Sequence, residues 1–206
     1  MAFSDFAYPA VLRTFGLTLQ HAPDLFAGVP EVSATPSLRE TLAVNVRLAT
    51  TLDTESARAM WMVSPVLSEF WWSYRGRIGV YTGLEFNADP EARLNGYCDF
   101  IIGTAPQQRQ IVAPVLVIFE AKRDNIMDSL GQCVAGMVGA ERFNRREGNP
   151  IETVYGVGTT GSVWRFLRLN GNVVSLDLVE YTIQQVDRLL GILTYIIGPV
   201  PGAAAA

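Results

Sequence analysis

Three residue types are scarce in this 206-residue sequence, and each scarcity limits the kinds of site it can build. The single histidine, His21, excludes a zinc site made from several histidines and argues against a histidine-based catalytic triad. The two cysteines, Cys98 and Cys133, are too few for a disulfide framework, so we expect reduced thiols in the core. Of the 16 basic residues only Lys122 is a lysine, which makes its position unusual.

Charged residues and long apolar runs are also limited. Only 17% of the residues are charged and 49% are hydrophobic, which is typical of a folded protein. The longest apolar runs, residues 111–119 and 189–200, are too short to cross a bilayer, and the N-terminus lacks the pattern of a signal peptide. We therefore expect a cytoplasmic protein with no membrane association. The net charge of −4 and the pI near 5.0 argue against nonspecific coating of DNA.

The length suits one well-cored domain with an additional arm. Residues 1–36 carry four prolines, and we expect them to form an N-terminal arm that packs on the core. Residues 37–198 would form the main domain, and residues 199–206, rich in proline and alanine, would form a tail.

Hydrophobic periodicity predicts an α/β fold with a mixed central sheet flanked by helices. Helices are expected over residues 38–50, 54–74, 126–145 and 182–196, the second kinked or split at Pro65 and the third buried. Strands are expected over residues 79–86, 96–103, 111–122, 153–159, 162–169 and 173–179. Asn170-Gly171 predicts a hairpin between the last two strands.

The position of Lys122 indicates a functional site. It ends an apolar strand two residues after Glu120, so strand alternation puts both side chains on one side of the sheet. A lysine ammonium can approach a phosphate or a water as a point charge. Asp99 stands where another strand becomes apolar, and neighbouring strands could bring it beside Glu120. Converging carboxylates are the ligands that Mg²⁺ prefers, and such ions assist phosphodiester hydrolysis.

These residues form part of a longer pattern: Gly96-x-x-Asp99-Phe100, an apolar strand, Glu120-Ala121-Lys122, and Gln132 on the next helix. The pattern resembles the PD-(D/E)XK nuclease superfamily over roughly residues 54–180. The resemblance implies a restriction-endonuclease-like core of order αβββαβ. It also implies hydrolysis of nucleic-acid phosphodiester bonds, in DNA more than in RNA, with Mg²⁺ or Mn²⁺ as cofactor. The proline of the family motif is replaced here by Cys98.

The resemblance also assigns roles to individual residues. Asp99 and Glu120 would bind the metal with help from the Ala121 carbonyl, and Lys122 would position or activate the attacking water. The family often places a glutamate on the first core helix, where Glu55 fits best and Glu69 competes with it.

Gln132 would orient the site, although the aromatic residue usual one turn later is replaced by Gly136. Ordinary structural roles remain open for three of these residues. Asp99 could be a turn or cap aspartate. Glu55 could simply favour a helix N-terminus, and Gln132 could be a half-buried helix residue.

Two other functions remain open. A non-catalytic module with the same fold could bind nucleic acid or protein, which the acidic pI favours. A structural subunit could form a homodimer through the apolar C-terminal helix, residues 189–197. Trp71, Trp72 and Tyr74 are expected as core or lid residues, and Arg142, Arg145 and Arg146 as favourable cations at a helix C-terminus.

Overall fold

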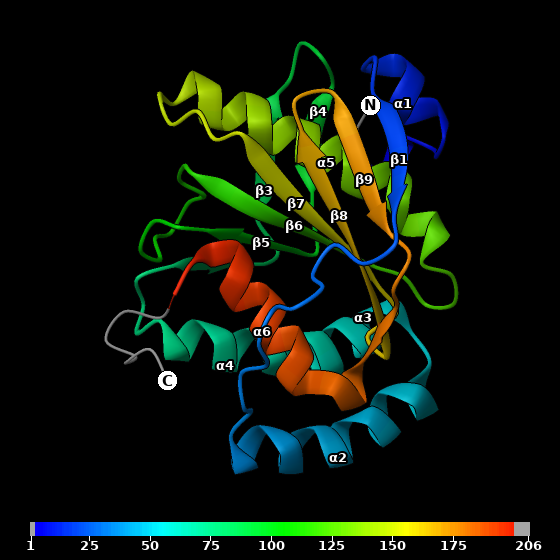
Figure 1. Cartoon of the computed structure of the whole chain (residues 1–206), viewed down its shortest axis with the longest axis vertical. Helices are drawn as coiled ribbons and strands as arrows, with labels where there is room; N and C mark the ends of the chain where they lie inside the picture. Colours follow the sequence, from blue (N-terminus) through cyan, green and yellow to red (C-terminus); the bar gives the residue numbers. More distant parts are fainter. Residues whose placement is uncertain (1–2, 200–206) are drawn as a thin grey trace.

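The computed structural model describes residues 3–199. Eight strands form one sheet: β1 (Thr18–Ala22), β2 (Gly79–Tyr81), β5 (Phe100–Gly103), β6 (Val115–Ala121), β7 (Thr153–Thr159), β8 (Val163–Asn170), β9 (Val173–Asp177) and β10 (Tyr181–Thr182). The order across the sheet is β1-β9-β8-β7-β6-β5-β2, and β10 pairs with β8 (Figure 1). β6 runs parallel to β7 and β1 parallel to β9, whereas the other pairs are antiparallel. The expected α/β fold with a mixed sheet flanked by helices is confirmed.

Helices cover both faces of this sheet (Figure 1). One core lies under α2 (Pro36–Leu52), α4 (Ser64–Ser73) and α6 (Val186–Ile197) and includes the fully buried Trp164 and Phe166. The other core lies under α5 (Met127–Arg146), with η1 (Phe3–Asp5) and α1 (Ala10–Thr14) beside it.

The buried helix expected over residues 126–145 is confirmed as α5. It connects the parallel strands β6 and β7 and packs directly on them. Its small residues allow this close approach, since a Cβ at Gly136 would lie 2.8 Å from the Ile118 side chain. α5 therefore fixes the end of β6, where the candidate site lies.

The single helix expected over residues 54–74 is divided into three. Thr54 caps α3 (Glu55–Arg58) by accepting the Ala57 N–H at 3.1 Å, and a π-helical turn, η2 (Ala59–Val63), leads into α4. Pro65 lies in the first turn of α4 and cannot donate a main-chain hydrogen bond. The chain nevertheless stays helical through residues 55–73, with right-handed helical backbone at Val63 and Ser64, so the expected split at Pro65 is replaced by a change to π-helical hydrogen bonding just before it.

Two expected strands are wrong as drawn. The strand over residues 79–86 is two strands, β2 and β3 (Glu85–Asp89), because Gly83 turns the chain at a φ of 68°. The strand over residues 96–103 is β4 (Leu94–Tyr97) and β5, interrupted at Cys98-Asp99. β3 and β4 pair with each other outside the main sheet. The strand expected from residue 111 begins at Val115, because Pro114 has no N–H to add to the ladder.

The ends of the chain differ in how they join the core. Within residues 1–36, β1 pairs with β9, with Thr18 opposite Val173, so this segment supplies a strand of the sheet. The last predicted helix starts with a short turn, η3 (Ile183–Gln185), before α6. Residues 200–206 of the predicted tail lie outside the described residues. Across residues 3–199, every helix is too short or too polar to span a membrane.

Candidate functional site

The candidate residues come together where β5 begins and β6 ends. Asp99 lies in the gap between β4 and β5, and Glu120 and Ala121 are the last residues of β6. Lys122 follows directly, and its N–H donates to the Thr159 carbonyl of β7 at 2.8 Å. The strands that carry these residues are held in register by the ladders of β5, β6 and β7.

Asp99 is bound to the end of β6. Its Oδ2 accepts the N–H of Ala121 at 2.6 Å. The N–H and C=O of one strand residue point to the same edge, so the Ala121 carbonyl also faces the side of Asp99. Burial raises the pKa of Asp99, and the Ala121 N–H and the Lys122 charge lower it in part. The predicted approach of the two strands therefore brings Asp99 to the main chain beside Glu120.

Glu120 is a buried carboxylate without a partner. Glu120 is 1% exposed, and neither carboxylate oxygen has a well-formed hydrogen bond from a described residue, although the Cys98 thiol lies near enough to act as a weak donor. Burial, and next the charge of Asp99, raise the pKa of Glu120 well above its ordinary value of 4.5. Lys122 and the Cys98 thiol lower this pKa in part. Buried polar groups almost always have partners, so this exception requires an explanation.

Two thiols lie beside this carboxylate. Cys98 and Cys133 are both free and buried, as the sequence predicted. Burial raises the pKa of each thiol, and the charge of Glu120 raises it further. Both thiols therefore stay protonated at neutral pH, and they are two neutral, weakly polar neighbours of Glu120.

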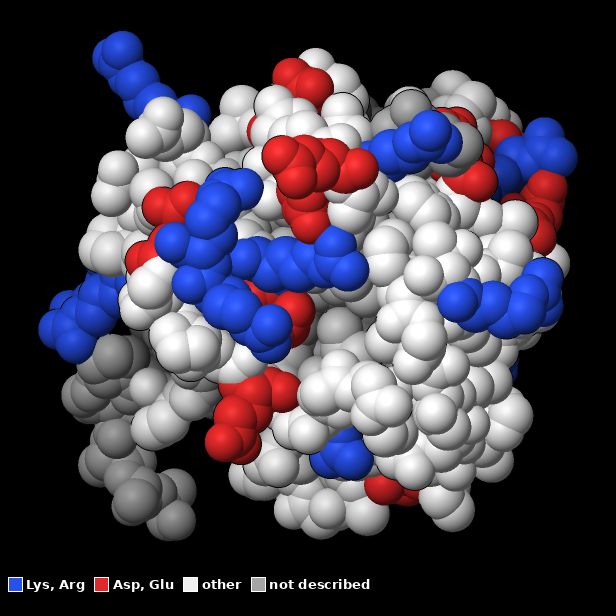
Figure 2. Space-filling model, turned by 90° about the horizontal axis from the view of Figure 1, so that it is seen from above, with Lys and Arg blue, Asp and Glu red and all other residues white. Residues whose placement is uncertain are grey.

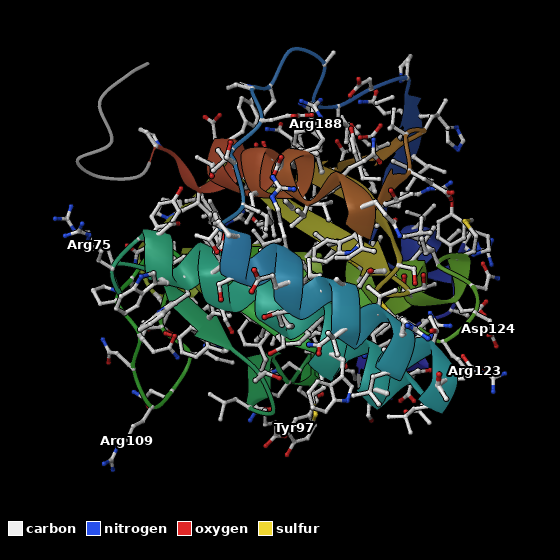
Figure 3. The ribbon with its side chains drawn as sticks, turned by 90° about the horizontal axis from the view of Figure 1, so that it is seen from below. Arg75, Tyr97, Arg109, Arg123, Asp124 and Arg188 are labelled. Atoms are coloured by element: carbon white, nitrogen blue, oxygen red, sulfur yellow. The ribbon has the colours of Figure 1, made fainter. Side chains whose placement is uncertain are left out.

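Lys122 lies nearer the surface than Glu120. Its Nζ is 3.7 Å from Oε2 of Glu55, the first residue of α3. Both residues line a polar pocket of about 390 Å³ that also contains Asp53, Asp124 and Asp128. Figure 3 shows Asp124 beside Arg123 at this end of the molecule, and the two side chains form an ion pair of 2.6 Å. The pocket therefore gathers four acidic residues with Lys122 and Arg123, and Asp53 and Asp124 among these acids are each paired with an arginine.

Glu55 and not Glu69 is the helix carboxylate at this site. The charge of Glu55 reaches both Asp99 and Glu120, whose pKa values it raises. Glu69 instead accepts the Thr35 N–H at 2.8 Å and the Thr35 hydroxyl group, at the N-terminus of α2. The choice that the sequence left open is therefore decided by position.

Gln132 lies on α5 near the site, and its hydrogen bond is to the main chain. Its Nε2 donates to the Tyr97 carbonyl at 3.3 Å, a long contact. Tyr97 ends β4, two residues before Asp99. Gln132 therefore supports the segment that carries Asp99.

The types of ligand atom at this site suit a hard divalent cation. Such a cation takes oxygen ligands, and the site offers two carboxylates and the Ala121 carbonyl. The unpartnered oxygens of Glu120 are the observation that favours this fit. Within residues 3–199, the side chains of histidine, cysteine, aspartate and glutamate do not form a group of three or more that is placed to hold a metal ion. A cation here would therefore depend on the main-chain carbonyl and on water for further ligands.

Sequence reasoning missed one residue of the site. Arg58, at the end of α3, donates to the Thr160 carbonyl at 3.0 Å and to Asp53 Oδ1 at 3.0 Å. It joins α3 to the chain beyond β7 and so holds Glu55 near Lys122. The sequence signal for Arg58 was its spacing of three residues from Glu55, which places the two side chains on one face of a helix.

Comparison with known proteins does not assign the chain to a family. No protein-family model matches the chain, and no curated protein matches it. The arrangement of the site itself is what points to a function.

Proposed function

We propose that this chain is a Mg²⁺-dependent nuclease of restriction-endonuclease-like fold that hydrolyses phosphodiester bonds, in DNA more than in RNA. Asp99, Glu120 and the Ala121 carbonyl would hold Mg²⁺ or Mn²⁺, and Lys122 would act on the attacking water. One observation carries the proposal: Glu120 is buried with both oxygens unpartnered, beside Asp99 and one pleat from the only lysine.

The order of the elements supports the fold part of the proposal. With the β3–β4 hairpin set apart, the chain runs α4, β2, β5, β6, α5, β7. This is the αβββαβ order of the PD-(D/E)XK superfamily that the sequence resembles. The first three strands are antiparallel neighbours, and the α5 crossover makes β7 parallel to β6.

The chemistry follows from what each side chain can do. A divalent cation, when bound, would neutralise charge on the phosphoryl oxygens and make the attacking water more acidic. Lys122 would hold that water or a phosphate oxygen through its ammonium. Glu55, 3.7 Å from the Lys122 Nζ, would keep this ammonium at the mouth of the site. The burial of Glu120 excludes bulk water and strengthens charge interactions there.

The acidic balance of the chain can be reconciled with a polyanionic substrate. Several of its acids, Glu55, Asp99 and Glu120 among them, are gathered at the site, where bound cations would offset their charge. On the face seen in Figure 2, a contiguous group of basic side chains is bordered on several sides by acidic ones. This surface favours local contacts to phosphates over nonspecific coating of DNA.

The alternative is a non-catalytic module that binds nucleic acid or protein. The 1% exposure of Glu120 favours it, because a substrate phosphate must approach the ligands closely. The two functions differ in one measurable property, since only the nuclease consumes its ligand in a metal-dependent way.

Cleavage of labelled single-stranded and duplex DNA in Mg²⁺ or Mn²⁺, with EDTA as the blank, tests the nuclease. Asp99→Ala, Glu120→Gln and Lys122→Ala should each lower the rate at least about 100-fold, the scale of one catalytic group. Glu69→Gln is the matched control, because Glu69 contacts Thr35 at the start of α2. It should cleave like the parent chain.

Circular dichroism must show that each variant is folded. Cleavage that survives Asp99→Ala and Lys122→Ala in folded protein would contradict the assignment. Folded parent protein that binds DNA without cutting it in either metal would favour the module.

A further inference from the structure

A second pocket, separate from the acidic one, lies beside α4. It has a volume of about 480 Å³ and lies between α4 and the last strand of the sheet path, β2. Trp71, Trp72 and Phe100 form much of its wall, and the hydroxyl groups of Ser64 and Ser68 add polar points. None of the described residues that line it is acidic. This volume and mixed lining suit a flat, partly polar ring such as a nucleobase.

The two tryptophans differ in how they are held. Trp71 is anchored, since its indole N–H donates to the Ile78 carbonyl at 3.1 Å. Trp72 packs against it with ring centroids 6.5 Å apart, yet is 73% exposed. Tyr74 is buried, as expected of a core residue, whereas the exposed Trp72 is not part of the core. An exposed indole supported by a fixed one provides a flat surface on which another ring can stack.

Arginines without acidic partners lie around the same end of α4. Arg75, Arg77 and Arg109 are exposed and form no ion pair or side-chain hydrogen bond with any described residue. Figure 3 shows Arg75 and Arg109 projecting from one end of the molecule. The arginines at the end of α5 differ, because each pairs with an acid: Arg142 with Asp89, Arg145 with Glu141, and Arg146 with Glu147.

The pocket and the acidic pocket lie along one helical run, since Glu55 lines the acidic pocket and Ser64, nine residues later, lines this one. Phe100, in its wall, follows Asp99 in the chain and packs in the core under α4, whereas Glu120 lies beside the thiols of the α5 core. Ser64 begins α4 and Trp72 lies eight residues later, so the wall is roughly 12 Å long at the rise of an α-helix. Trp72 lies 17 residues after Glu55 on this run, roughly 25 Å at the same rise, so a strand that stacks on Trp72 could reach the acidic pocket within several nucleotides.

We propose that this groove binds single-stranded nucleic acid and leads it to the acidic pocket at Lys122. An unpaired base would stack on Trp72, and the neighbouring phosphates would contact Arg75, Arg77 and Arg109. The free positive charge there complements a phosphate backbone. Duplex bases are stacked on one another and cannot enter such a pocket. The inference rests on the proposed function for its cleavage step, whereas the binding step does not need metal.

Fluorescence anisotropy with a labelled single strand of about ten nucleotides, in EDTA, tests the binding step. The single strand should bind more tightly than the matched duplex. Trp72→Ala should weaken binding roughly tenfold, the effect of one lost base–aromatic stack, and Trp72→Phe should keep most of the affinity. Because Trp72 is exposed, neither change removes a core contact.

The arginines are tested by the salt dependence of the same affinity. Arg75→Ala, Arg77→Ala and Arg109→Ala should each reduce the slope of log affinity against log salt by about 0.7. Arg47→Ala is the matched control, because Arg47 is exposed on α2 and lines a different pocket. It should leave the slope unchanged.

The results separate this inference from the proposed nuclease. No binding of the single strand, or equal binding by the parent and Trp72→Ala proteins, would overturn the groove even if duplex DNA were cut. Trp72-dependent binding with no cleavage in Mg²⁺ or Mn²⁺ would support the groove and contradict the nuclease.

Discussion

At the scale of single residues, Glu120 is the most informative side chain. A carboxylate that is 1% exposed and unpartnered among the described residues destabilises the fold when it is ionised. Strongly perturbed carboxylates of this kind are concentrated at functional sites. The burial is imposed by α5 and by the flanking thiols Cys98 and Cys133. The fold thus maintains an unfavourable group at the one place where a cation could relieve it.

Glu120→Gln should stabilise the metal-free protein at pH 8 by about 1–3 kcal/mol, because it removes a buried charge without a partner. The pKa of Glu120 is raised, so the native state binds more protons than the unfolded state above pH 4.5. The parent chain therefore loses stability as pH rises through the native pKa, and the variant does not.

Denaturant melts in EDTA at several pH values measure the difference. The gain from Glu120→Gln should be largest at pH 8 and should disappear near pH 4.5. Glu69→Gln weakens a helix cap and should lower stability at pH 8. A Glu120→Gln protein less stable than its parent at pH 8 would show that the carboxylate has a stabilising partner.

Residue positions could be predicted from the sequence where local geometry decides them. Strand alternation and the single lysine were sufficient to select Glu120 and Lys122. The choice between Glu55 and Glu69 could not be predicted, because it depends on the π-helical turn between them and on the contact of Glu69 with Thr35. The hydrogen bond of Gln132 to Tyr97 likewise depends on where β4 ends.

At the scale of elements, segments with strong local signals were predicted correctly. α5, β7 and the β8–β9 hairpin follow from hydrophobic periodicity and from Gly171, which has a φ of 55°. The divisions at Gly83 and Cys98 were missed, because the chain there leaves one sheet for another. β1 was missed too, since its pairing with β9 joins segments more than 150 residues apart.

Asp187→Asn tests how α6 is attached to the N-terminal segment. Asp187 accepts two contacts from Arg39, each 2.6 Å, and the Ala34 N–H at 2.8 Å. The Arg39 contact and then the Ala34 N–H lower the pKa of Asp187 below 3.8. Solvent screens this half-exposed pair, so we expect a loss of about 1 kcal/mol at pH 7.

The pH dependence gives the sign of this effect. The contribution of Asp187 is complete above pH 3.8 and is lost as pH falls through the lower native pKa. The stability difference between parent and Asp187→Asn proteins should therefore shrink below pH 3.8. Asp124→Asn, in an exposed pair with Arg123, is the control and should change stability little. A constant difference down to pH 2 would rule out the ion pair as the cause.

At the scale of the whole molecule, the apolar run of α6 is explained within the chain. Leu189, Leu190, Ile192 and Leu193 are buried in the core shared with α2 and α4. The observation that suggested a homodimer through this helix therefore has another cause, and Tyr195 remains its exposed large residue at 58%. The acidic pocket at Lys122 and the pocket along α4 are the surfaces on which the two proposals rest.

The most direct measurement for the central claim is Mn²⁺ binding followed by electron paramagnetic resonance, with the parent chain and folded Asp99→Asn and Glu120→Gln proteins. We expect the parent to bind Mn²⁺ at a site that Mg²⁺ competes for, and each variant to lose at least about tenfold in affinity, the scale of one ligand's contribution. Equal Mn²⁺ affinity in all three proteins, or none in the parent, would contradict a shared cation at Asp99 and Glu120.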